Sequence, residues 1–109
     1  MKLYGLKTCD TCRKALKALT PPGFTVQFID LRADDLSDEE RARFFEVLGG
    51  DLLNTRSTTW RGLSGDTRKA APLELLKLHP ALMKRPVIED DHGALTLGWG
   101  AQTQARFGL

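Results

Sequence analysis

The chain is poor in the residues and patterns that mark several large protein classes. It has two cysteines and two histidines in 109 residues, and no second Cys-x-x-Cys motif. Its formal net charge of +2 is too weak to mark a nucleic-acid-binding surface. No apolar run approaches the roughly 20 residues that cross a bilayer. These absences argue against direct nucleic-acid binding, a membrane-spanning role and a fold built on many disulfides.

The sequence also indicates the compartment in which the protein works and the number of its domains. The N-terminus begins directly with a strand pattern, so we expect no signal peptide. Two close cysteines without a wider disulfide framework suit a reducing compartment, so we expect a cytoplasmic protein. A length of 109 residues fits one domain with one hydrophobic core, and no internal repeat is visible.

What the chain does have is a cysteine pair in an informative place. Cys9 and Cys12 follow a short apolar strand pattern and stand where a helix pattern begins. The N-terminus of a helix presents unpaired N–H groups and partial positive charge, which favour a thiolate over a thiol. Further positive charge comes from Lys7, Arg13 and Lys14. This environment is typical of a reactive cysteine.

Three interpretations of the pair compete. In a redox couple, Cys9 is the exposed nucleophile and Cys12, one helical turn later, resolves a mixed disulfide. As a zinc site the pair supplies only two of four ligands, with His79 and His92 as the only histidines. In a purely structural role, Cys12 is a small core residue on the inner helix face with Leu16 and Leu19. We favour the redox couple and expect no bound metal.

The rest of the pattern predicts alternating strands and helices. We expect strands over 2–6, 24–31, 87–88 and 94–97, and helices over 10–19, 38–48, from Pro72 and over 101–107. Residues 20–23, Thr-Pro-Pro-Gly, should stop the first helix. Ser37 and Glu40 form a capping box, and Gly49-Gly50 ends the helix that it opens. In the helix from Pro72, we expect leucines to face inward, namely Leu73 and Leu76, with Leu75 and Leu78 as further candidates.

This order predicts the fold class. A β-α-β unit followed by a β-β-α unit, with Cys-x-x-Cys at the first helix, is the thioredoxin-like arrangement. We therefore expect an α/β protein with a thioredoxin-like mixed sheet flanked by helices. Residues 1–109 should form a single domain, with a mostly helical insertion at about 32–84.

Three blocks of sequence carry a specific resemblance. They are residues 3–15 (LYGLKTCDTCRKA), 52–61 (LLNTRSTTWR), and 79–99 with its HP, KRPVI and LGW elements. In this order they resemble the arsenate-reductase-related family, which includes arsenate reductase (ArsC), the Spx regulators and the YffB-type thiol reductases. The middle block is most similar to the YffB type. The second cysteine is more similar to Spx.

The resemblance implies a role for several residues. Cys9 matches the nucleophilic cysteine, and Arg56 matches an active-site arginine of the insertion. Arg85 matches the arginine before a cis-proline, and Pro86 matches that proline, which completes the implied substrate-binding set. A guanidinium near Cys9 would stabilise the thiolate and hold an oxyanion or carboxylate. Both arginines have a simpler alternative as solvated loop residues.

One departure from the resemblance bears on function. Arsenate reductases carry a third arginine just after the last strand, where this chain has Gly98, Trp99, Gly100 and Ala101. Losing that cation weakens an oxyanion site. We expect a small thiol-disulfide reductase with glutathione as co-substrate and no bound cofactor. The alternatives are an arsenate reductase that uses glutathione and glutaredoxin, and an Spx-like redox sensor that binds RNA polymerase.

Overall fold

The computed structural model describes residues 1–20, 25–33 and 36–109 of the chain. Its contacts divide the chain into two compact units, one of residues 1–34 and 85–109 and one of residues 35–84. The first holds the sheet and both cysteines, and the second holds most of the short helices.

The sheet unit has four described strands in the order β2-β1-β3-β4. Parallel pairing joins β1 and β2, whereas β1 with β3 and β3 with β4 are antiparallel. The bounds are β1 Lys2–Gly5, β2 Gln27–Asp30, β3 Val87–Glu89 and β4 Leu95–Leu97. The α/β class with a mixed thioredoxin-like sheet, expected from the sequence, is confirmed.

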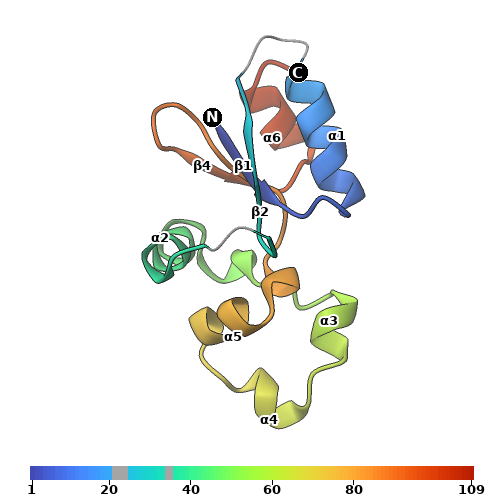
Figure 1. Ribbon diagram of the computed structural model, residues 1–109, viewed down its shortest axis with the longest axis vertical. Helices are drawn as coiled ribbons and strands as arrows, with labels where there is room; N and C mark the ends of the chain where they lie inside the picture. The colour runs from blue at the N-terminus through green and yellow to red at the C-terminus, as the bar shows by residue number, and fades with distance from the viewer. Residues whose placement is uncertain (21–24, 34–35) are drawn as a thin grey trace. The chain divides into compact units, whose positions relative to one another are not determined.

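Two helices accompany this sheet, α1 (Asp10–Leu19) and α6 (Ala101–Arg106), and they lie beside each other in Figure 1. Leu3 of β1 pairs with Ile88 of β3, so both side chains occupy one face of the sheet. They form a fully buried cluster with the inner face of α1, made of Cys12, Ala15 and Leu19. Burial of these apolar side chains is the main force holding α1 on the strands.

The contact between α1 and β1 depends on a glycine. A Cβ atom built on Gly5 would lie 2.4 Å from the Cys12 sulfur and 3.1 Å from the Cys12 Cβ. Both distances are well below van der Waals contact. Glycine is therefore the only residue type that can occupy position 5 while Cys12 packs directly on the end of β1.

The second unit is mostly helical. Its elements are α2 (Asp38–Leu48), η1 (Gly49–Leu52), α3 (Thr58–Arg61), α4 (Gly65–Arg68), α5 (Pro72–Leu78) and η2 (Pro80–Leu82), where η marks a 3₁₀ helix. Distant parts of the unit join through Leu53 and Met83, which form an isolated antiparallel bridge. Beside it, the Asn54 N–H donates to the Leu82 carbonyl at 2.7 Å.

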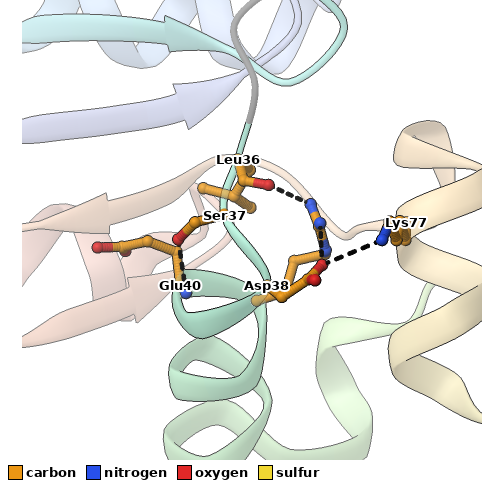
Figure 2. A network of polar contacts seen from close by, with 6 residues as sticks. Leu36, Ser37, Asp38, Glu40 and Lys77 are labelled. Atoms are coloured by element: carbon orange, nitrogen blue, oxygen red, sulfur yellow. Dashed lines mark hydrogen bonds and ion pairs between the residues drawn. The ribbon is translucent and has the colours of Figure 1, made fainter.

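The start of α2 shows the expected cap. The Ser37 hydroxyl accepts a hydrogen bond from the Glu40 N–H at 3.1 Å, as Figure 2 shows. The Arg41 guanidinium donates to Asp38 at 2.6 Å, and Lys77 of α5 lies 3.5 Å from the same carboxylate. At the other end, Gly49 has a φ of +68°, which closes the helix as the glycine pair predicted.

The structure corrects several expected boundaries and orientations. Strand β2 covers only part of the expected 24–31, and the Pro-Pro-Gly-Phe stretch at 21–24 lies outside the described residues. In α5, Leu75 and Leu76 are buried, whereas Leu73 and Leu78 are 38% and 63% exposed. At about 100° per residue these four positions point to different sides of the helix, so they cannot all face inward. Among the described helices, none is long and apolar enough to traverse a membrane.

The close approach at Gly5 gives a stability prediction. Gly5→Ala should destabilise the protein by about 1–3 kcal/mol, because the new methyl group overlaps the Cys12 sulfur. In a Cys12→Ala background the same change should cost much less. Urea unfolding of the unaltered protein, the two single variants and the double variant measures the coupling free energy between positions 5 and 12. Gly50→Ala is the control, because a Cβ there has no heavy atom within 4 Å. Equal penalties in both backgrounds would contradict the prediction.

Candidate active site

Cys9 occupies the first position before α1. Its backbone is extended, with φ −86° and ψ 119°, and its carbonyl accepts the Arg13 N–H at 3.1 Å. Its own N–H donates to the Leu6 carbonyl at 3.0 Å, which closes the turn between β1 and α1. Cys9 is half-buried. The turn therefore places the sulfur at the positive end of the helix while leaving part of it accessible.

The surroundings of Cys9 favour its ionised form. Partial burial alone would raise the pKa of its thiol. Hydrogen bonds from the Cys12 backbone N–H, the Arg85 guanidinium and the Cys12 thiol outweigh that effect, together with the positive charge of Arg85. The pKa of Cys9 therefore lies below its ordinary value, as expected for a thiolate at the start of a helix.

Cys12 has the opposite character. It is fully buried against Gly5, and burial is the main reason that its pKa rises to about 11. The neighbouring Cys9 raises it further, while a hydrogen bond from the Leu6 backbone N–H partly offsets the rise. Cys12 thus belongs to the core, as the structural interpretation holds, and also contacts the reactive sulfur, as a redox couple requires. The two sulfurs differ in both exposure and acidity.

Arg85 reaches the site from a distant part of the sequence. The Arg85-Pro86 peptide bond is cis, as the resemblance implies, and Pro86 is buried directly before β3. The Pro86 carbonyl accepts the Gly98 N–H at 2.8 Å, which ties this turn to the residue after β4. The structure therefore brings two predicted site residues, Cys9 and Arg85, into hydrogen-bonding contact.

Arg56 belongs to the other unit, so its approach to Cys9 stays a prediction. Its N–H donates to the Asn54 side chain at 3.1 Å, and its side chain is exposed. Arg56 lines a polar cavity of about 630 Å³ within that unit, which Asp51, Asn54 and Lys84 also line. Two of these side chains, Arg56 and Lys84, are cations and one, Asp51, is an acid, so the positive charges are in excess. The cavity is suited to a small anion.

The region after β4 contains an aromatic pair where arsenate reductases are expected to carry a third arginine. Trp99 stacks on Phe107, with ring centroids 6.3 Å apart and planes 26° apart, and both pack against the buried cluster of the sheet unit. Arg106 lies 3.6 Å from the Asp90 carboxylate. The one arginine near the C-terminus is thus paired with an acid of the β3–β4 hairpin. As for metals, the described residues contain no cluster of three or more His, Cys, Asp or Glu side chains.

Comparison with known proteins agrees with this geometry. The model of the ArsC family matches residues 4–107. The chain belongs to the ArsC family. An uncharacterized protein of Haemophilus influenzae is 39% identical over 98 residues, which cover 85% of this chain and 86% of its own length. As a member of this family with a low-pKa cysteine, the chain is a thiol-reductase-like protein.

Two solved structures of ArsC family relatives are similar over almost the whole chain. A YffB protein has a TM-score of 0.85 at 29% identity and covers 96% of each chain. An arsenate reductase (ArsC) related protein from Brucella melitensis has a TM-score of 0.76 at 37% identity and covers 99% of this chain and 94% of its own. The thioredoxin-like arrangement is thus shared with proteins of recognisable sequence similarity.

Two contacts of the cysteine pair were not expected from the sequence. Gly5 admits the Cys12 sulfur, and the Leu6 backbone bonds to both cysteines, through its carbonyl to Cys9 and its N–H to Cys12. Main-chain contacts of this kind leave no mark on side-chain patterns. The glycine ending an apolar strand before Cys-x-x-Cys was the one available signal.

The difference between the two thiols gives a prediction about reactivity. Alkylation of Cys9 should follow a pH midpoint below that of an ordinary thiol, and Cys12 should react slowly below about pH 11. Mass spectrometry of Cys9→Ser and Cys12→Ser variants measures each rate separately. Arg85→Gln should raise the Cys9 midpoint, because it removes a cation and a strong donor. Faster reaction at Cys12 would refute the assignment of the nucleophile.

Proposed function

We propose that this protein is a small thiol-disulfide reductase of the ArsC family, with Cys9 as nucleophile, Cys12 as resolving cysteine and glutathione as co-substrate. The observation that carries the proposal is the asymmetry of the pair. One sulfur is accessible and stabilised as thiolate by Arg85, and the other is buried beside it as thiol. Such a pair suits attack by the first cysteine and resolution by the second.

The first step is attack by the Cys9 thiolate on a glutathionylated substrate. A disulfide forms between Cys9 and the glutathione sulfur, while the bond between glutathione and the substrate breaks. The substrate leaves as a thiolate, which takes a proton from solvent. The low pKa of Cys9 supplies the thiolate without a separate general base.

The second step is attack by Cys12 on the Cys9 sulfur, which forms the Cys9–Cys12 disulfide and releases reduced glutathione. The high pKa of Cys12 opposes this step in the resting protein. The negative charge of the Cys9 thiolate contributes to the high pKa of Cys12. In the mixed disulfide the Cys9 sulfur carries no charge. The pKa of Cys12 therefore falls once the mixed disulfide has formed, which is when Cys12 must attack. Two further glutathione molecules then reduce the pair and form one oxidised glutathione.

Arg56 and Arg85 are the proposed anion-binding groups of this reaction. Arg85 contacts Cys9, and a glutathione sulfur joined to Cys9 would bring carboxylates near it. Arg56 and Lys84 offer a polar cavity of about 630 Å³ with two cations, which suits a carboxylate. Pro86, which is buried between Arg85 and the first residue of β3, completes the proposed substrate-binding set.

Arsenate is a weaker candidate substrate. Trp99 is packed on Phe107 and the sheet cluster. Position 99 therefore supplies no third cation to bind an oxyanion. Arg106 is already paired with Asp90. The site is better suited to a thiol substrate with a carboxylate than to a compact, highly charged oxyanion.

Turnover assays test this proposal. With a glutathionylated peptide and glutathione, Cys9→Ser should abolish activity. Arg85→Ala and Arg56→Ala should each lower kcat/KM by about tenfold or more, the effect of losing one charge-assisted hydrogen bond. Arg61→Ala is the matched control, because Arg61 is an exposed arginine of the same unit as Arg56 and does not line the cavity.

The same assay distinguishes the competing functions. Arsenate, tested beside the disulfide with glutathione and glutaredoxin present, should be turned over poorly. Efficient arsenate reduction would replace the thiol-reductase proposal. Absence of all turnover, combined with binding to RNA polymerase that changes when Cys9 and Cys12 are oxidised, would favour the regulator. If Arg61→Ala lowers activity as much as Arg56→Ala, the role proposed for Arg56 is wrong.

A further inference from the structure

Asp30 is the only charged side chain that is buried among the described residues, with 7% of its surface exposed. It ends β2, directly beside the end of β1, because Gly5 and Asp30 are partners in the parallel register. The reaction scheme above gives it no role. A buried carboxylate is costly unless hydrogen bonds satisfy its oxygens, so its contacts show what the position requires.

The carboxylate of Asp30 binds backbone N–H groups on two segments. Its Oδ1 accepts from Arg32 at 2.8 Å and from Ala33 at 3.1 Å, both just after β2. Its Oδ2 accepts from the Lys7 N–H at 3.1 Å, in the turn between β1 and α1. The two oxygens thus have separate tasks. Oδ1 holds the backbone directly after β2, and Oδ2 holds the turn that leads to Cys9.

The turn held by Asp30 also contacts both sulfur-bearing residues. The Leu6 carbonyl, adjacent to the Lys7 N–H in the same peptide group, accepts the Cys9 N–H at 3.0 Å. The Leu6 N–H bonds to the Cys12 sulfur. A planar peptide unit cannot move one of its ends without moving the other. Anchoring the Lys7 N–H therefore fixes the Leu6 carbonyl that orients Cys9.

We infer that Asp30 is a positioning residue for the cysteine pair: its ionised carboxylate holds the Leu6–Lys7 peptide group in the place that keeps Cys9 at the head of α1. None of these three hydrogen bonds of Asp30 reaches a sulfur, so Asp30 acts through the backbone. The inference concerns the reactivity of Cys9, and it rests on the proposed function only for its effect on turnover.

The test compares Asp30→Asn with Asp90→Asn. An asparagine at 30 has one oxygen and one NH₂ group, so either Lys7 or the Arg32–Ala33 pair must face a donor. Asp90 is the matched control, because it too accepts two backbone N–H groups, from His92 and Ala94, but in the β3–β4 hairpin. Both of those bonds use Oδ1, which asparagine retains. Urea unfolding reports the stability of each variant.

The readout is the pH profile of Cys9 alkylation, followed by mass spectrometry. Asp30→Asn should raise the midpoint by about half a pH unit or more, which slows alkylation at neutral pH roughly threefold, because a displaced Cys9 weakens the hydrogen bond that its sulfur accepts from the Cys12 N–H. Asp90→Asn should leave the midpoint unchanged. An unchanged Cys9 midpoint in both Asp30→Asn and Asp30→Ala overturns the inference, because alanine removes both acceptor oxygens. Equal midpoint shifts in Asp30→Asn and Asp90→Asn overturn it too. A shift confined to Asp30→Asn supports it, even where no disulfide substrate is turned over.

A measurement on the unaltered protein covers the case in which Asp30→Asn does not fold. The Arg32 N–H, with those of Lys7 and Ala33, holds the pKa of Asp30 below its usual value against the opposing effect of burial. In an acid titration followed by NMR, these three amides should shift with one common midpoint, and the Cys9 amide should shift with them. A Cys9 amide that does not follow the Lys7 amide overturns the inference.

Discussion

The missing side chain at Gly5 lets the Cys12 sulfur lie directly on the end of β1, and the arrangement of the site depends on that contact. It fixes how closely the first turn of α1 approaches the sheet. With Cys12 fully buried there, its backbone N–H is aimed at Cys9 and lowers the pKa of that thiol. The core packing of Cys12 and the lowered pKa of Cys9 therefore have the same geometric origin.

Burial separates two chemically identical side chains. Cys12 is withdrawn from water and resists ionisation, while Cys9 keeps partial exposure and gains Arg85 as a cationic neighbour. The difference arises from one helical turn of sequence, because position 9 precedes the helix and position 12 lies on its inner face. The start of a helix next to the end of a strand thus gives two cysteines different exposure and acidity.

Local signals predicted the parts of the fold that depend on few residues. Helix α1 begins and ends where the pattern at 10–19 indicated, and Ser37 caps α2 as its spacing with Glu40 required. The four-residue helices at 58–61 and 65–68 escaped notice, although Ser57 and Ser64 cap them. Helices that short carry no apolar period, so only their caps could have revealed them.

The candidate site was harder to predict, because its contacts join residues distant in sequence. Cys9 was identifiable from its motif, whereas Arg85 and Pro86 were assigned only through the family resemblance. No periodicity could pair Asp30 with the Lys7 backbone, 23 residues away, since the contact requires β1 and β2 to be parallel and in register. A parallel pair brings the carboxyl ends of two strands to one edge of the sheet. An acid that ends β2 thereby lies beside the turn that begins α1, and the three backbone N–H groups that it binds satisfy a charged side chain at a buried position.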